Sequence, residues 1–288
     1  MTNTWMNKMN QTIIAVILFV FVLLCVLPVF YVIAVSLTPV TETLKRGVIL
    51  IPYSITFDAY REILSGNGLG SAYQVTIIRT VLGTALNLFF TVITAYPLSR
   101  SKLPGRSGFL LYIVFTMLFS GGLIPTYLLI RELHLINTIW VLIVPGLISA
   151  FNLVIIKGFF EQLPTELDES AKVDGASEWI ILWKIILPLS LPVMATIGLF
   201  YAVGHWNAYF DAVIYINDTN LMPLQVVLRN ILLNVQLENT DPLNTSTVVS
   251  MIAQQMAAVV VATLPILIIY PFVQKHFTKG VLLGSIKG

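Results

Sequence analysis

Six long stretches of the chain contain no charged residue. They cover residues 9–41, 80–99, 107–130, 133–156, 185–210 and 242–274, and each is at least twenty residues long. A helix needs about twenty apolar residues to cross a hydrocarbon core that is roughly 30 Å thick. These stretches mostly lack the polar face of a helix in a soluble bundle. The pattern therefore predicts an all-α, polytopic membrane protein with six transmembrane helices.

The composition agrees with this prediction, because 57% of the residues are hydrophobic and 10% are charged. Soluble domains have about a quarter of their residues charged. The first apolar run is too long for a signal peptide, and no convincing small-residue cleavage site follows it. The single cysteine, Cys25, has no partner for an intramolecular disulfide. We therefore expect one transmembrane domain over residues 1–288, embedded in a lipid bilayer.

The distribution of Lys and Arg predicts which side of the membrane each loop faces. If the N-terminus is inside, the inner segments hold ten of these residues: Lys8, Arg100, Lys102, Arg106, Lys157, Lys172, Lys184, Lys275, Lys279 and Lys287. The outer segments hold five, namely Lys45, Arg46, Arg61, Arg131 and Arg229, and Arg79 lies near the outer end of the second span. The excess predicts a multi-pass protein of the bacterial cytoplasmic (inner) membrane with both termini in the cytoplasm.

Acidic residues gather in one predicted cytoplasmic loop, where residues 161–178 hold six of the fourteen acids. The segment "LPTELDESAKVDG" is typical of a short amphipathic helix. We expect Thr165 to be its N-cap, with Asp168 three residues later as in a capping box. Gly175 can adopt a positive φ and so end the helix. From these features alone, an ordinary solvated linker remains an equal alternative.

The same loop resembles the EAA loop of the membrane subunits of ABC importers. That signature has the order E-A-A, D-G-A and I-x-L-P. It corresponds here to Glu169-Ser170-Ala171, Asp174-Gly175-Ala176 and Ile185-Ile186-Leu187-Pro188. Ser170 departs from the alanine of the pattern, but it is small enough to pack closely.

This resemblance implies the fold of a type I ABC importer permease. It also implies that residues 161–190 form a cytoplasmic coupling loop, which docks into a cleft on a separate ATPase subunit. The implied coupling residues are Glu169, Ser170, Ala171, Asp174, Gly175, Ala176, Leu187 and Pro188. Glu169 would pair with a basic residue of the partner, and Asp174 would cap the turn.

Two further stretches are similar to the sugar-transporting branch of this family, close to the smaller permease subunit of maltose importers. They are "GGLIPTYLLIRELHLINTIWVLIVPGL" (residues 121–147) and "FVQKHFTKGVLLGSIKG" (residues 272–288). The resemblance implies that the cytoplasmic tail 272–288 contacts the ATPase subunits through Lys279, Gly280, Lys287 and Gly288. From the residues alone, a basic terminus beside anionic lipid is the alternative.

Polar, glycine and aromatic residues inside the apolar runs are candidates for a substrate path. They are Asn87, Gly121, Gly122, Asn152, Tyr201, Trp206, Asn207 and Tyr209. Asn87 belongs to a polar stripe on the second run, which either lines the path or forms hydrogen bonds between helices. The glycines and Pro125 interrupt the third run and favour a gate or cavity. The aromatic residues suit sugar rings, but an interfacial aromatic belt is the alternative.

Several classes of function lack their usual signals in this sequence. There is no GxxxxGK[ST] loop for nucleotide, no Cys/His cluster with metal-ligand spacing and no evident catalytic triad. The net charge of +2 is too small to suggest nucleic-acid binding. We expect a transport subunit that is not an enzyme and binds no metal or cofactor, with ATP and magnesium held by the partner ATPase.

The resemblance implies an importer of oligosaccharides, including uronate-containing fragments of polysaccharides. Its implied partners are a second homologous permease, two copies of an ATPase subunit and an extracytoplasmic solute-binding protein. Two alternatives remain open: a permease of the same architecture for a non-sugar solute such as a peptide, and a stand-alone secondary transporter. The scarcity of charge inside the spans argues against the latter.

Overall fold

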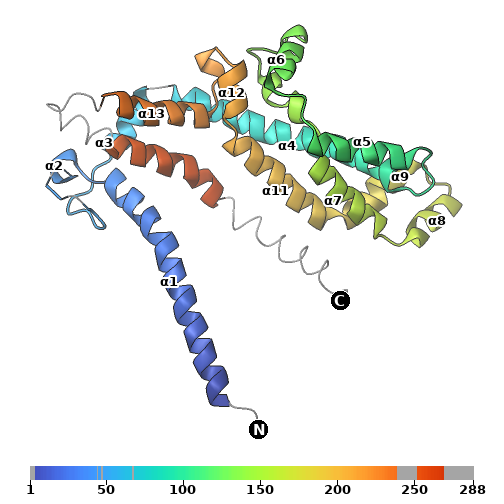
Figure 1. Cartoon of the computed structure of the whole chain (residues 1–288), viewed down its shortest axis with the longest axis horizontal. Helices are drawn as coiled ribbons and strands as arrows, with labels where there is room; N and C mark the ends of the chain where they lie inside the picture. Colours follow the sequence, from blue (N-terminus) through green and yellow to red (C-terminus); the bar gives the residue numbers. More distant parts are fainter. Residues whose placement is uncertain (1–3, 44, 47, 67, 239–251, 269–288) are drawn as a thin grey trace. The chain divides into compact units, whose positions relative to one another are not determined.

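The computed structural model describes residues 4–43, 45–46, 48–66, 68–238 and 252–268, and every regular element among them is helical. The first half contains α1 (Thr4–Ser36), α2 (Val40–Thr43), α3 (Asp58–Gly66), α4 (Leu69–Ser99), α5 (Arg106–Leu118) and α6 (Leu123–Glu132). The short helices η1 (Ile139–Leu142) and η2 (Val144–Gly146) precede α7 (Ala150–Glu161). The all-α prediction is confirmed for this part of the chain (Figure 1).

The second half continues with α8 (Thr165–Val173), α9 (Glu178–Ile181), the π-helical segment η3 (Leu182–Ile186), α10 (Leu187–Leu189) and α11 (Leu191–Asn207). After these come α12 (Phe210–Tyr215), η4 (Thr219–Leu221) and α13 (Leu224–Glu238). The last described helix is Ile252–Ile268. The predicted tail 272–288, with Lys279, Gly280, Lys287 and Gly288, lies outside the described residues.

Two helices are long and apolar enough to span a membrane by themselves, Gln11–Ser36 within α1 and Leu69–Ser99. Three more apolar runs form bent pairs: Arg106–Leu118 with Leu123–Glu132 (113°), Ile139–Gly146 with Ala150–Glu161 (50°), and Glu178–Leu189 with Leu191–Asn207 (82°). Counting each pair as one span gives up to five. The prediction of six spans is therefore not confirmed, although the described helix Ile252–Ile268 lies in the sixth run.

Glycine and proline account for the first and third bends. At the first bend Gly122 has φ 89°, a conformation that side-chain-bearing residues rarely adopt, and it is the N-cap of α6. At the third bend Pro188 and Pro192 each lack the N–H that an α-helix needs. The π-helical turn Leu182–Ile186 stands just before Pro188. Both proline and π-turns are known causes of sharp kinks.

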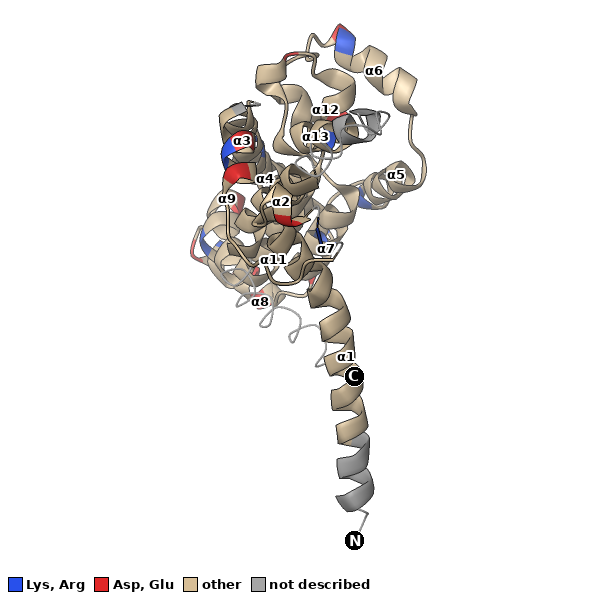
Figure 2. Ribbon diagram, turned by 90° about the vertical axis from the view of Figure 1, so that its left-hand side faces the viewer, with Lys and Arg blue, Asp and Glu red and all other residues tan. Residues whose placement is uncertain are grey.

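The described residues divide into two compact units, of which the first contains residues up to Leu69 and 227–265. In this unit Ile49 packs against Ala34 and Val35 at the end of α1, with Tyr31, Ile252 and Met256 around them. The rest of α1 is different: the side chains of residues 11–30 are exposed on all sides and none is charged (Figure 2). Such a helix is suited to lipid or to another membrane protein.

The second unit contains residues 70–226 and, among the described residues, 266–268, and it holds the predicted coupling loop. Its main core joins α4, α7, the α9–η3 segment and α11 through buried apolar side chains, including Val92, Ala95, Ile156, Ile181, Leu182 and Ile197. Ala171 of α8 is part of the same core. The loop helix is therefore packed against the membrane helices and not suspended from them. That residues 1–288 form one domain stays a prediction.

Candidate functional site: the coupling loop and the polar contacts within the membrane helices

The helix of the acidic loop, α8, ends in a Schellman motif formed by the D-G-A residues of the signature. Gly175 has φ 77°, and its N–H donates to the carbonyl of Lys172 (3.0 Å). The N–H of Ala176 donates to the carbonyl of Ala171 (2.9 Å), which is the 6→1 bond of this motif. Asp174 is the C-cap residue, as expected. The predicted positive φ of Gly175 is confirmed, and a residue with a Cβ would be strained there.

The start of α8 differs from the prediction. Its N-cap is Pro164, and no side chain makes a cap hydrogen bond. Thr165 is thus the first helical residue, so the predicted N-cap and capping box are wrong. The carboxylate of Asp168 turns instead to Arg100, with one bond of 3.0 Å to Nη2 and a second, shorter one to Nη1. A two-pronged ion pair with a guanidinium outweighs a local cap because both groups are charged.

Ion pairs connect the acidic loop to basic residues of neighbouring helices and loops. Arg106 pairs with Glu161, which also contacts Lys157 at 2.8 Å, and Lys172 pairs with Glu178 at 2.7 Å. The hydroxyl of Tyr96, near the end of α4, donates to Glu178 at 2.6 Å. Red and blue residues accordingly gather around α8 and α9 in Figure 2. The loop is therefore tied to α4 and α7 as well as to its own neighbours.

Half of the acidic residues take no part in this internal pairing. Within the described residues Glu166, Glu169 and Asp174 form no ion pair, and all three are exposed. Val173 lies on the same helix and is 87% exposed, although it is apolar. This surface combines uncompensated negative charge with an apolar side chain, which suits a basic, partly apolar partner.

A cavity of about 950 Å³ opens between the coupling loop and the short loop that follows α4. Its lining combines both signs of charge with apolar side chains, including Arg100, Lys102, Asp168, Glu169, Lys172 and Trp179. Sequence reasoning did not predict this cavity or the ion pairs across it. A signal was present, because the sequence assigns Arg100, Lys102 and Arg106 to the same side of the membrane as the acidic loop, with the opposite charge.

The last part of the signature, Ile185 to Pro188, forms the bend that leads into α11. Leu187 packs against the core, whereas Pro188 is exposed. Ser190 is fully buried at the bend, and its hydroxyl donates to the carbonyl of Ile186 at 2.7 Å. The coupling loop is therefore continuous with a membrane helix through a kinked but well-bonded joint.

Inside the membrane helices, Asn87 joins three segments by hydrogen bonds. Its side-chain amide donates to the carbonyl of Gly146 at 2.6 Å, and its oxygen lies 3.0 Å from Nε2 of His205. Asn87 is almost fully buried. Because the amide nitrogen is used by Gly146, the oxygen accepts and Nε2 of His205 carries the proton. Asn87 of the polar stripe therefore forms hydrogen bonds between helices, which is one of the two interpretations of the stripe.

Tyr201 of α11 likewise joins separate segments by hydrogen bonds, one turn farther along α4. Its hydroxyl lies 2.8 Å from Oγ1 of Thr91 and accepts from the N–H of Ser149 at 3.0 Å. The Ser149 side chain in turn caps α7 at the N–H of Asn152. Three of the predicted path residues, Asn87, Asn152 and Tyr201, thus meet at the break between η2 and α7. Backbone groups freed by a broken membrane helix need such partners.

The other predicted path residues lie apart from this cluster. Gly121 and Gly122 are exposed at the α5–α6 bend, and a side chain at either would not clash. Asn207 is exposed and bonds the carbonyl of Val203 in its own helix, while Tyr209 is 42% exposed beside Phe210. Trp206 is buried against Tyr73. That these residues contact a substrate stays a prediction.

One buried ion pair was not expected from the sequence. Arg79 of α4 is only 3% exposed and pairs with Asp211 of α12, while also donating to the carbonyl of Ala208 at 3.2 Å. The sequence predicts that Arg79 lies near the outer end of the second span, but its pairing with Asp211 depends on which helices meet. Among the described residues, no group of three His, Cys, Asp or Glu side chains could hold a metal ion.

Comparisons with known proteins identify relatives that match nearly the whole chain. A polygalacturonan/rhamnogalacturonan transport system permease of Bacillus subtilis (strain 168), YtcP, is 45% identical over 290 residues, covering 98% of this chain and 99% of that protein. Protein LplC of the same organism is 48% identical over 267 residues, covering 91% and 90%.

A solved structure is also similar, that of a bacterial ABC transporter involved in the import of the acidic polysaccharide alginate. It superposes with a TM-score of 0.87 at 31% identity, covering 96% of this chain and 99% of the matched chain. The family model for binding-protein-dependent transport system inner membrane components matches residues 1–283. The chain therefore belongs to this family of transporter membrane subunits.

Proposed function

We propose that this chain is the membrane-spanning permease subunit of an ATP-driven importer for oligosaccharides. It forms half of the translocation pathway and is not itself an enzyme. The observation that carries the proposal is the coupling loop, in which α8 is fixed to the membrane helices on one side and presents unpaired carboxylates on the other. The relatives, which include polysaccharide-related permeases, support the same assignment.

The coupling step follows from how α8 is held. A displacement applied to the exposed Glu169 and Val173 surface passes through Ala171 into the core, and through Asp168 to Arg100 at the end of α4. It also passes along the chain through the bend at Pro188 into α11. Because closely packed elements move as units, a push on α8 moves the ends of α4 and α11 together. This would convert closure of two ATPase subunits into alternating access.

The proposed partners follow from what this chain does not supply. A second homologous permease would complete the pathway, and two copies of an ATPase subunit would bind the coupling loops and hold ATP and magnesium. An extracytoplasmic solute-binding protein would deliver the substrate, in keeping with the description of the family. In the orientation predicted from the Lys and Arg residues, both termini would lie in the cytoplasm. The tail 272–288 would also reach the ATPase subunits.

The proposed substrate class is an oligosaccharide derived from an acidic polysaccharide. Two similar proteins support it: one is named as a polygalacturonan/rhamnogalacturonan transport system permease, and the other belongs to a transporter involved in the import of alginate. Uptake assays with reconstituted transporter and labelled uronate-containing oligosaccharides, neutral oligosaccharides and peptides would test it. Uptake of peptides alone would favour the non-sugar alternative, and uptake without any ATPase would favour a secondary transporter.

The coupling role is tested by substitutions in α8. We expect Glu169→Lys combined with Gly175→Pro to leave membrane insertion intact and to abolish co-purification with the ATPase subunits. Glu132→Lys is a matched control, because that carboxylate is also exposed on a helix (side chain 73% exposed) but lies on the predicted outer side. Normal ATPase binding and uptake in the double variant would overturn the assignment.

A single substitution at Gly175 tests the turn at the end of α8 without changing the charge of Glu169. Gly175 and Gly158 both have open space where a Cβ would lie, but only Gly175 has a positive φ. We therefore expect Gly175→Ala to weaken ATPase binding by distorting the turn, whereas Gly158→Ala is expected to have little effect. Equal behaviour of the two variants would remove the Schellman turn from the mechanism.

A further inference from the structure

The loop that follows α1 exposes an unusual number of apolar side chains. Residues 48–57, "VILIPYSITF", carry no charge. Ile51 and Tyr53 are 77% and 80% exposed, and Val48, Leu50, Ile55 and Phe57 are also exposed. Six exposed apolar side chains within ten residues of a folded chain indicate contact with a membrane or a partner.

Both ends of this loop are fastened beside the last turns of α1. Ile49 is 1% exposed and packs against Ala34 and Val35. Farther along, the N–H of Thr56 donates to the carbonyl of Leu37 at 2.9 Å. The loop therefore folds back along the end of the span, to a depth of about one helical turn, roughly 5 Å. Its exposed side chains lie at the level where an apolar span leaves the hydrocarbon.

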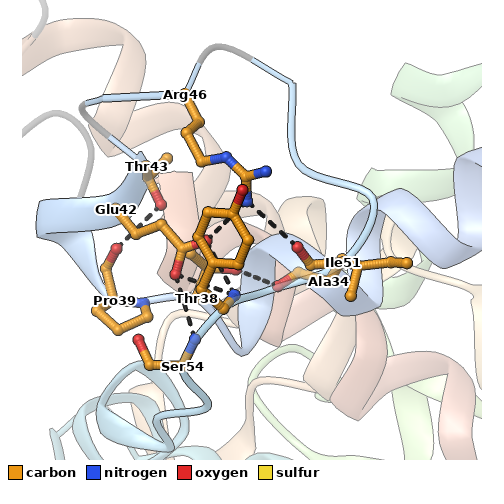
Figure 3. A network of polar contacts seen from close by, with 9 residues as sticks. Ala34, Thr38, Pro39, Glu42, Thr43, Arg46, Ile51 and Ser54 are labelled. Carbon is orange, nitrogen blue, oxygen red and sulfur yellow. Dashed lines mark hydrogen bonds and ion pairs between the residues drawn. The ribbon is translucent and has the colours of Figure 1, made fainter.

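Part of the loop backbone is bonded by two side chains that precede the loop, those of Glu42 and Arg46 (Figure 3). The Glu42 carboxylate accepts from the N–H of Tyr53 at 3.0 Å and 3.2 Å and from that of Ser54 at 3.4 Å. Arg46 pairs with Glu42 at 3.1 Å and stacks over the Tyr53 ring, with its guanidinium carbon 3.7 Å from the ring centroid. The N–H groups of Tyr53 and Ser54 therefore have partners other than water. Irregular backbone near hydrocarbon needs such partners.

The electrostatics of Glu42 agree with this role. The N–H of Tyr53, with further bonds from Arg46 and Ser54, holds the pKa of the Glu42 carboxyl below its usual value. The carboxylate is therefore charged at neutral pH and keeps its acceptors available. The contribution of this network is present above the ordinary carboxyl pKa and is lost only as the pH falls through the lowered value.

We propose that residues 48–57 form an interfacial anchor, which inserts the exposed side chains of Ile51, Tyr53 and their neighbours into the bilayer leaflet at the end of α1. In the predicted orientation this is the outer leaflet. We assign the surface to lipid, because the loop directly follows an apolar span and continues its exposed, uncharged surface. Tyr53 and Phe57 are of the types enriched at membrane interfaces. Arg46 and Asp58 bracket the loop and would lie among the headgroups.

A single-cysteine experiment tests the depth of the loop. Cys25 is the chain's only cysteine, so Cys25→Ser gives a background for Ile51→Cys labelled with an environment-sensitive fluorophore. The full-length chain is reconstituted in liposomes with and without its partner subunits. Quenching by lipids with a doxyl group high on the acyl chain is compared with quenching by aqueous iodide. Arg61→Cys, at a side chain 82% exposed on α3, is the matched control.

We expect the label at position 51 to be quenched by the doxyl lipid and largely protected from iodide, and the label at position 61 to show the reverse. Ile55→Cys serves if the first variant does not fold. Strong iodide quenching at both loop positions would overturn the proposal. Protection that appears only after adding the solute-binding protein or the second permease would also overturn it, and would assign the surface to that protein.

A second variant tests whether the polar network holds the loop in place. Glu42→Ala removes the acceptor of the Tyr53 and Ser54 N–H groups. We expect the label at position 51 to lose its protection from iodide in this variant, while the label at position 61 is unchanged. Unaltered lipid quenching in Glu42→Ala would contradict the role given to the network.

Discussion

The loop end and the middle of the second span, α4, are joined to their neighbours in different ways. At the loop end, Arg100 and Tyr96 contact Asp168 and Glu178 through charged hydrogen bonds. Nearer the middle, Asn87 and Thr91 contact other helices through neutral groups only. The two sets of contacts serve the same purpose, which is to hold α4 against the coupling loop, α7 and α11.

The difference follows from the surroundings of each set. An unpaired charge in hydrocarbon is expensive, whereas an amide or hydroxyl can be satisfied by one or two bonds. At the loop end water lowers the cost of breaking an ion pair, so such a pair can rearrange when a partner binds. The middle of α4 is therefore suited to a fixed framework, and its loop end to a contact that changes.

The largest loss of stability is expected where Gly83 of α4 lies against the ring of His205 of α11. A Cβ at Gly83 would lie 2.5 Å from Nε2 of His205. Gly83→Ala should therefore shift the ring or the helices and destabilise the protein by about 1–3 kcal/mol. Gly70→Ala in the same helix meets nothing within 4 Å and is the control. Thermal unfolding in lipid nanodiscs measures both variants, and equal stability would show that the helices are farther apart.

The next largest loss of stability is expected from the neutral hydrogen bonds of Asn87 in the middle of α4. Asn87→Leu leaves the Gly146 carbonyl and His205 without their partner, and we expect a cost of about 1–2 kcal/mol, as for strong interhelical hydrogen bonds in membranes. The cost should not change with salt. Combining it with His205→Leu should give less than the sum of the single losses. Additive losses would mean that Asn87 and His205 do not interact.

A smaller effect on stability is expected at the loop end. Asp168→Asn should cost up to about 1 kcal/mol, and less at high salt, because the pair with Arg100 is partly exposed. Transport should fall more than stability, since the contact passes movement from α8 to α4. The charge exchange Arg100→Asp with Asp168→Arg should recover part of the uptake. Full uptake in Asp168→Asn would remove this contact from the coupling path.

The smallest effect is expected for the exposed pair of Lys172 and Glu178, whose side chains are 52% and 54% exposed. Lys172→Met should change stability by no more than about 0.5 kcal/mol. ATPase-stimulated uptake should be nearly unchanged as well. A loss as large as that of Asp168→Asn would show that the loop end is held more rigidly than exposure indicates.

Local features of the structure were predictable from the sequence, whereas contacts between distant residues were not. Gly175 ends α8 as expected, because the requirement for a positive φ is local. Thr165 does not cap the helix, because Asp168 is drawn to Arg100, a residue 68 positions away. Likewise, the polar stripe on α4 was visible, but its partners Gly146 and His205 depend on how helices pack. Charge-free runs gave the approximate positions of the spans and could not give their bends.

The π-helical turn at Leu182–Ile186 sets the rotational phase between the coupling loop and α11. Such a turn holds one residue more than an α-helical path would need. Deleting one residue there would rotate the preceding helix α9 by about 100° about the helix axis relative to the following residues. The carboxylate of Glu178 would then point away from Tyr96, although every local motif would remain in the sequence. The direction in which α8 and α9 face relative to α11 is thus set by the number of residues in this turn and not by their chemical type.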